Sequence, residues 1–504
     1  MSTNTILTSS GVEVKVFPYS EFQGIDTSRD RAALDSGEKQ SLFIIEDGFA
    51  DWRGVLVRDP GAVSRNSGDG KISHVNFYGR NEACWAQRDG GGVSLASDRF
   101  FSHGPGHKLD EVYPVGSTVT STVFNHRTIF ATAGQPMYRY NGASWEEVIN
   151  LNPQTPAFLA AVQQRLCVAK ANGTLVDLSR VDDETYFTED EVAGATSVTK
   201  GGNIDIRNLL GTSDVIKGLS AFEQNRLAIF TNDQCLIYTL HPDLTKWEID
   251  DRANIQVGTI SHNAVARAYS DLLYCSRNGI HSIQRSRTNG VTIFSIPMSF
   301  KVEQTYRALL KTVTNQEEIS SYFDQDNGQF HTYFPQGPLL TNRLTLTLDP
   351  TGENNNKWST GSFLQATCGR QLGPTTLLGT PGGVWNRKLV EDETDISPTM
   401  IVETPILWQG AINDLKDSHS IIIQASGKGT IDIEAFDELD RPLSGMTFEI
   451  SGLGVDDSFG PVPLSLQYER KFQHRYRGVY FRFKIKGTGL LRMTGFAVTI
   501  RSDK

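Results

Sequence analysis

The chain has 504 residues, a formal net charge of −10 and scattered basic residues, which argues against a protein that reads DNA or RNA sequence through a concentrated basic patch. Glycine is abundant, with 46 residues, and long helical patterns are scarce, so the composition favours an all-β protein. No apolar run reaches the roughly 20 residues that span a bilayer and no secretion signal is visible, so we predict no membrane span and folding in a cytosol.

Residues 1–70 are predicted to form an extended, loop-rich N-terminal segment. Its first clear pattern is Val12, Val14 and Val16 alternating with polar residues, which indicates a half-buried strand. We divide the rest of the chain into a repeat region at 71–390 and a C-terminal module at 391–504.

A hairpin-like unit recurs through the repeat region. Its clearest copies lie at 218–238 and 258–283, where two apolar runs are separated by a turn sequence. Further copies turn at Ala133-Gly134, Asn172-Gly173, Asp326-Asn327-Gly328 and Pro381-Gly382-Gly383. The spacing of roughly 40 to 60 residues suits a unit of four short strands, which predicts the blades of a β-propeller. An array of several β-sandwiches is the alternative.

Other features of the repeat region are less regular. Residues 302–313 carry apolar side chains on one face, which predicts a helix that bridges two blades. The acidic stretch 182–211 is predicted to loop out of the ring. The five cysteines lie at wide spacing, mostly inside apolar runs, and are therefore expected to be reduced core thiols: Cys84, Cys167, Cys235, Cys275 and Cys368.

The pattern changes after the acidic run Glu391-Asp392-Glu393-Thr394-Asp395. Apolar runs at 421–424 and 431–435 flank a glycine-rich turn at 427–429, and a second turn at 487–489 precedes a last strand at 490–500. Closely spaced turn signals of this kind predict a small antiparallel β-sandwich.

We find no residues that predict catalysis, cofactor binding or metal binding, so we expect a protein that is not an enzyme. The sequence His103-Gly104-Pro105-Gly106-His107 could approach a metal, but proline and glycine prevent a helix from presenting both imidazoles on one face. The stretch 324–328 starts like a calcium loop, yet Pro335 stands where the closing glutamate belongs, which favours a hairpin turn. Adjacent carboxylates such as Asp182-Asp183 point to opposite faces of a strand and are better explained as solvated turns.

Several short motifs, taken in order, resemble the tail nozzle proteins of short-tailed bacteriophages, also called tail tubular protein B, and the related packaged-DNA-stabilisation proteins. The motifs are Gly24-Ile25-Asp26, Arg58-Asp59-Pro60-Gly61, Gln224-Asn225-Arg226-Leu227, Gly258-Thr259-Ile260-Ser261 and Arg277-Asn278-Gly279-Ile280. Asp59 departs from the family pattern because it interrupts an arginine-proline pair.

The resemblance implies a structural virion protein with a propeller and a platform. About six copies would form the distal ring of the tail, docked on a tail tubular protein A-like adaptor ring. The ring would contact tail fibres or spikes and pass double-stranded DNA without sequence-specific binding. It would be assembled in the host bacterial cytoplasm. We further hypothesise that acidic loops line the DNA channel and that the stretch 182–211 narrows it.

Two other functions compete with this interpretation. A receptor- or glycan-binding propeller would use exposed aromatic side chains such as Trp145, Trp247 and Trp358 as stacking platforms. We expect these tryptophans to serve as core residues instead. A propeller hydrolase would need carboxylates that converge at the centre of the ring.

Overall fold

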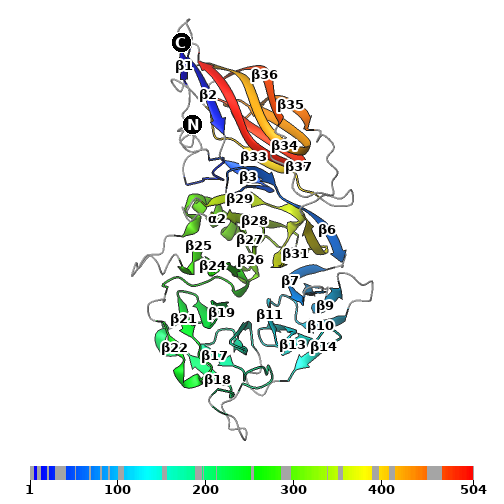
Figure 1. The fold of residues 1–504 in the computed structure, drawn as a ribbon, viewed down its shortest axis with the longest axis vertical. Coiled ribbons are helices and arrows are strands. Elements are labelled where there is room, and N and C mark those ends of the chain that lie inside the picture. Colours follow the sequence, from blue (N-terminus) through cyan, green and yellow to red (C-terminus); the bar gives the residue numbers. More distant parts are fainter. Residues whose placement is uncertain are drawn as a thin grey trace.

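In the computed structural model, the described residues are 5–7, 13–19, 22–28, 41–51, 53–66, 70–79, 82–88, 91–99, 107–149, 156–187, 196, 198–211, 213–250, 255–284, 297–337, 339–349, 356–388, 397–407, 415–450, 468–478 and 480–502. They form an elongated molecule with two bodies, a ring of small sheets and a strongly curled sheet (Figure 1). The predicted all-β class with a propeller is confirmed, and the C-terminal module, predicted as a small antiparallel β-sandwich, lies in a single curled sheet.

Five propeller sheets consist of strands that follow one another in the sequence. The first two sheets contain β7 (Lys71–Tyr78), β8 (Glu82–Arg88), β9 (Val93–Arg99), β10 (Lys108–Tyr113), β11 (Val119–Phe124), β12 (Arg127–Thr132), β13 (Met137–Tyr140) and β14 (Trp145–Val148). The next two contain β15 (Phe158–Val162), β16 (Arg165–Ala169), β17 (Leu175–Leu178), β18 (Gly202–Asp205), β19 (Ile216–Phe222), β20 (Arg226–Thr231), β21 (Cys235–Thr239) and β22 (Glu248–Ile249). The fifth contains β23 (Val265–Ala268), β24 (Asp271–Ser276) and β25 (Gly279–Ser282). Four of the predicted hairpins coincide with neighbouring strands of these sheets, namely β12–β13, β16–β17, β20–β21 and β24–β25.

Distant parts of the chain close the ring. The sixth sheet combines β30 (Cys368–Leu372), β31 (Thr375–Thr380) and β32 (Gly383–Lys388) with β6 (Gly61–Asn66), which precedes the first blade. A seventh sector holds β26 (Ser320–Asp324), β27 (Gln329–Pro335), β28 (Thr341–Thr347) and β29 (Lys357–Gly361). Its innermost strand, β26, contacts β23 on one side and β30 on the other. Main-chain pairing between β6 and β32 therefore fastens the two ends of the repeat region together.

The second body is one curled antiparallel sheet organised on two long paired strands, β34 (Lys416–Phe436) and β37 (Arg482–Ser502). Strands from both ends of the chain flank them: β1 (Thr5–Leu7), β2 (Glu13–Tyr19), β3 (Ile44–Glu46), β4 (Gly48–Ala50), β5 (Leu56–Arg58), β33 (Met400–Glu403), β35 (Pro442–Ile450) and β36 (Tyr468–Gly478). The N-terminal segment and the C-terminal module thus share one sheet (Figure 1).

Two predicted turns of the C-terminal module are wrong. The glycine-rich sequences at 427–429 and 487–489 lie inside β34 and β37, where Gly429 pairs with Gly489. A Cβ atom on Gly429 would lie 1.9 Å from the Thr488 carbonyl oxygen, and Gly489 has φ +77°. The glycines therefore allow close approach and bending of two continuous strands instead of ending them.

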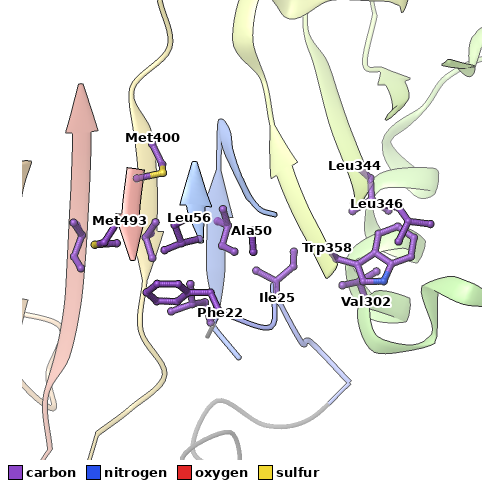
Figure 2. Close-up of a cluster of buried hydrophobic side chains, with 14 of the residues drawn as sticks. Phe22, Ile25, Ala50, Leu56, Val302, Leu344, Leu346, Trp358, Met400 and Met493 are labelled. Carbon is purple, nitrogen blue, oxygen red and sulfur yellow. The ribbon is translucent and has the colours of Figure 1, made fainter. Parts of the chain in front are cut away.

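The two bodies share one continuous hydrophobic core (Figure 2). Trp358 on β29, only 1% exposed, packs on the propeller side of the junction with Val302, Leu344 and Leu346. The residues labelled on the other side and between the bodies are Phe22, Ile25, Ala50, Leu56, Met400 and Met493. Because these side chains form one cluster, we infer that the junction resists relative motion of the two bodies.

Two further features of the repeat region are now placed. The predicted helix is confirmed as α2 (Glu303–Thr312), which contacts β25 and β27 and so bridges two sectors of the ring. The prediction that residues 182–211 loop out is wrong for their described part, because β18 is the fourth strand of a blade and Glu184 is buried against Arg127 and Arg139. Residues 188–195 and 197 lie outside the described residues. All five cysteines are buried and free of disulfides, as predicted.

Candidate functional site on the propeller axis

The axial end of the propeller, where the innermost strands begin, carries a cavity of about 230 Å³. Side chains from several sectors line it, among them Thr118, Thr120, Phe158, Lys217, Ser261 and His262. The Phe158 and His262 rings stack with their centroids 5.5 Å apart. The wall therefore combines hydroxyl groups, an aromatic face and a charged group, which is a composition typical of small-ligand pockets.

A short 3₁₀ turn, η7 (Gln316–Glu318), borders this cavity and ties opposite sides of the ring together. The Glu317 carboxylate lies 3.1 Å from the Lys217 ammonium, and Ser261 Oγ donates a hydrogen bond to the Glu317 carbonyl. The Glu318 carboxylate accepts from Lys71 at 3.4 Å and from Arg88 at 3.1 Å. The carboxylates of Glu317 and Glu318 are thus neutralised by cations from two other blades of the ring.

Two imidazoles, His74 on β7 and His262 just before β23, interact electrostatically with the guanidinium of Arg370 on β30. Burial first, and the nearby Arg370 charge second, lower the pKa of His262 to about 4. Burial, Arg370 and His262 together lower the pKa of His74 to about 3. His74 Nε2 lies 2.7 Å from Ser121 Oγ, and His262 Nδ1 accepts a hydrogen bond from the Leu219 N–H. Both imidazoles are therefore neutral at physiological pH.

Acidification from pH 6.5 towards pH 4 should destabilise the protein through these two histidines. In the unfolded chain they take up protons near pH 6.5, whereas in the folded state they stay neutral until about pH 4, so stability falls as pH falls. Each histidine adds up to about 1.4 kcal/mol per pH unit to this slope. Urea unfolding at pH 7, 5.5 and 4.5 measures it.

A His74→Gln, His262→Gln double variant should flatten that slope, and His126→Asn, at an exposed turn, should leave it unchanged. Asp47 contributes to the pH dependence of stability with the opposite sign. Burial raises the pKa of its carboxyl from 3.8 to about 6, so stability falls as the pH rises between these two values. An unaltered slope in the double variant would contradict the assignment.

A second buried polar cluster holds the propeller to the N-terminal segment. The Asp59 carboxylate, 1% exposed, pairs with Arg343 on β28 and lies 3.4 Å from Arg387 on β32. Arg387 also lies 2.8 Å from the Asp324 carboxylate and donates to His331 Nε2 at 3.1 Å. The cluster thus links the start of β6 with two sectors of the ring.

Burial determines the protonation state of His331 in this cluster. Burial, followed by the charges of Arg387 and Arg343, holds the pKa of His331 well below its ordinary value. His331 accepts the Arg387 hydrogen bond through Nε2, so its Nδ1 carries the proton and donates to Thr345 Oγ1 at 2.9 Å. We expect this cluster to stabilise the fold and not to bind a ligand, because arginines already pair with its carboxylates.

The structure places the sequence candidates as follows. His103 lies outside the described residues, and the described residues contain no group of three or more His, Cys, Asp or Glu side chains that could hold a metal ion. The stretch 324–328 forms the β26–β27 hairpin. Trp358 is a core residue, whereas Trp145 and Trp247 are half-buried on or beside outer strands.

Sequence reasoning missed the axial residues. His74, His262 and Arg370 lie far apart in the sequence and in no recognisable motif. The available signal was the place of His74 and Arg370 in the first strand of a repeat and of His262 just before such a strand, since first strands line the axis of a propeller. That signal becomes usable only once the repeat boundaries are known.

These features define the chain as a β-propeller protein with an attached curled sheet. No protein-family model and no curated protein matches the sequence. Among solved structures, an extracellular domain of a hybrid two-component system from B. thetaiotaomicron is similar, with 11% identity, a TM-score of 0.41 and coverage of 82% of this chain and 56% of that one. A one-component-system extracellular domain from the same organism has 12% identity and a TM-score of 0.37 over 65% and 40%. YCF48 from Cyanidioschyzon merolae has 9% identity and a TM-score of 0.37 over 65% and 98%.

The chain therefore spans only about half of the first matched structures, 40% to 56% of their length. At these identities the likeness concerns the fold alone. Within the described part of the chain, no helix is long and apolar enough to cross a membrane.

Proposed function

We propose that this chain is a structural subunit of the tail nozzle of a short-tailed bacteriophage, which forms a ring of about six copies on an adaptor ring and provides the channel for DNA ejection. The observation that carries the proposal is the way both chain ends interleave in one curled sheet that shares its core with the propeller. Such a unit transmits force between its two bodies as one piece, which suits a part of a DNA-ejection machine.

The places of the nozzle-like motifs support this proposal. Gly24-Ile25-Asp26 lies at the junction, where the Ile25 N–H donates to the Trp358 carbonyl at 3.0 Å. A Cβ atom on Gly24, which has φ +79°, would lie 2.6 Å from the Trp358 nitrogen. Arg58-Asp59-Pro60-Gly61 carries the buried carboxylate that binds Arg343. Two of the motifs that suggested the family thus hold the two bodies together.

The axis of a single propeller is too narrow to pass DNA, which favours a channel formed between subunits. Glu317 and Glu318 join cations from separate blades across the axial end. A DNA duplex is far wider than the ligand-sized cavity at this axial end, so a passage for DNA requires several copies around a larger opening.

The ring is tested by light-scattering mass and electron micrographs of the purified protein, alone and mixed with the adaptor ring of the same phage. We expect a ring of about six copies with a central hole, alone or on the adaptor. Repeating the measurement at tenfold lower concentration distinguishes a defined ring from aggregation. A monomer or trimer that does not bind the adaptor would contradict the proposal.

The axial cavity favours a second candidate, a receptor- or glycan-binding propeller. Phe158 offers a stacking face, and Thr118, Thr120 and Ser261 offer hydroxyl groups beside it. A glycan array tests this candidate directly. Binding that is lost in Phe158→Ala and kept in Trp145→Ala would move the assignment from assembly to recognition.

A further inference from the structure

A cavity of about 200 Å³, which we call the junction cavity, lies where the curled sheet meets the propeller. The curled sheet lines it with residues of the β4–β5 hairpin and of β37, and the propeller contributes Asn327 from the β26–β27 turn. Neither of the functions considered above uses this cavity. A molecule bound in it would contact both bodies of the protein.

Strand pairing determines which side chains of the curled sheet face the junction cavity. Phe49 pairs with Val57, and Val57 pairs with Arg492. Residues that pair directly place their side chains on the same face of a sheet. The next row of paired residues lies on the opposite face, buried in the shared core (Figure 2): Ala50, Leu56 and Met493. The cavity is therefore bounded by an aromatic ring, a branched aliphatic side chain and a guanidinium.

Arg492 is a cation without a counterion on this wall. It is half-buried, and its neighbours on β37, Leu491 and Met493, are 2% and 0% exposed. Within the part of the chain that the structure describes, the Arg492 guanidinium makes no hydrogen bond and no ion pair. A guanidinium has five N–H donors and no acceptor, so a bound anion is the partner that would satisfy it.

A tight turn places a second guanidinium at the edge of the junction cavity. The Asp51 carboxylate accepts the Val55 N–H at 2.9 Å, and the Asp51 carbonyl accepts the Gly54 N–H at 2.9 Å. Gly54 has φ +85°, a conformation that favours glycine. Arg53 lies inside this turn, where it is exposed and lines the cavity. The turn thus holds Arg53 within the same site as Arg492.

The lining of the junction cavity carries an excess of positive charge. It includes three arginines and one acidic residue, Asp51. The third arginine, Arg58, donates from Nη1 to the Pro398 carbonyl at 3.0 Å, so we assign the ligand to Arg53 and Arg492. Guanidinium groups bind carboxylates and phosphates through two parallel hydrogen bonds. The charge of this lining therefore selects an oxyanion.

The remainder of the lining is apolar and selects a ligand with an apolar body. Phe49, Val55, Val57 and Pro60 contribute to it. An inorganic ion would leave this apolar surface uncovered, whereas a neutral hydrocarbon would leave the half-buried Arg492 without a partner. A molecule that combines an oxyanion with an apolar body satisfies both parts of the cavity.

We propose that the junction cavity binds a small organic oxyanion, in which a phosphate or carboxylate group is attached to an apolar or aromatic body. Arg492 and Arg53 hold the oxyanion, and Phe49 and Val57 pack against the body. The inference goes beyond the tail assignment and requires one subunit only. Because Asn327 belongs to the propeller, the bound ligand also stabilises the junction.

Phenyl phosphate and benzoate are the probes, titrated into the full chain by calorimetry at constant ionic strength. Inorganic phosphate and phenol serve as the two halves of the ligand. We expect saturable binding of at least one probe, at least tenfold tighter than either half, and a melting temperature that rises with that probe. The tighter of the two probes identifies the oxyanion as phosphate or carboxylate.

Arg492→Gln should weaken binding of the tighter probe at least tenfold. Arg492→Lys should weaken it less, because the charge remains while the planar fork is lost. Arg207→Gln is the matched control, since it removes the same charge from a side chain that is 75% exposed on the 3₁₀ turn η2 (Arg207–Leu209), outside the cavity. It should change binding less than twofold. Without ligand, Arg492→Gln should melt close to the wild-type temperature.

Three results would overturn the proposal: no saturable binding of either probe by the wild type, unchanged affinity in Arg492→Gln, or inorganic phosphate binding as tightly as the tighter probe. If Arg492→Gln fails to fold, unchanged affinity in a folded Arg492→Lys variant overturns it as well. The mass measurement of the ring is a separate readout, so a failure of ring assembly leaves this result unaffected.

Discussion

Replacing Asp59 by alanine should lower the free energy of unfolding by about 3–5 kcal/mol, because it leaves two buried arginines without their shared carboxylate. Arg343 and Arg387 are 6% and 4% exposed in their side chains, so water cannot replace the lost partner. Chemical denaturation followed by fluorescence measures the loss. Asp59→Asn, which keeps the volume and removes the charge, should lose nearly as much.

The matched control for this experiment is Asp110→Ala. Asp110 also forms an ion pair, with Lys108 at 2.7 Å, but the two side chains are 71% and 48% exposed. Exposed pairs contribute about 0–1 kcal/mol, so this variant should unfold close to the wild type. Equal losses in Asp59→Ala and Asp110→Ala would show that the buried cluster does not hold the closing blade.

The Asp59 cluster also shows a limit of what can be predicted from the sequence. By sequence, Asp59 only interrupts an arginine-proline pair. In the structure its two oxygens face Arg343 and Arg387, which lie hundreds of positions later in the chain. No local signal identifies such partners, because the contact exists only after the ring has closed through β6 and β32.

Local signals were sufficient for six hairpins of the ring, although none of them lay in the first blade, β7 to β10. Asn-Gly and related turns between apolar runs located hairpins such as β16–β17 and β24–β25, because a hairpin depends on a few neighbouring residues. The same glycine signal failed in β34 and β37, where the strands continue through residues 427–429 and 487–489. A glycine that bends a strand against a glycine of its partner has the sequence of a turn, and only the pairing distinguishes them.

The motif Gly258-Thr259-Ile260-Ser261 illustrates a similar limit for the site. A Cβ atom on Gly258 would lie 2.1 Å from the Thr231 carbonyl oxygen, and Thr259 Oγ1 donates to the Cys275 carbonyl at 3.0 Å. The motif is therefore a structural corner. The residue that follows it, His262, faces the axial cavity and drew no attention in the sequence.

Replacing Trp358 by alanine should lower the free energy of unfolding by about 3–5 kcal/mol, the range for truncation of a large, fully buried aromatic side chain. Trp358 pairs with Leu346 through the β28–β29 ladder, and its backbone binds Ile25 of the N-terminal segment. The ring therefore lies where the propeller core continues into the core of the curled sheet (Figure 2). Trp358→Phe should recover most of the loss, because it refills most of the volume.

The same substitution tests whether the two bodies behave as one unit. Loss of the ring should separate the single unfolding transition into two and increase proteolysis at the junction, since the shared core is opened there. Trp145→Ala, on the half-buried outer strand β14, should cost less than half as much and keep one transition. A loss below about 1 kcal/mol in Trp358→Ala would mean that each body is stable through its own core. The force-transmitting unit invoked for the tail nozzle would then lack its physical basis.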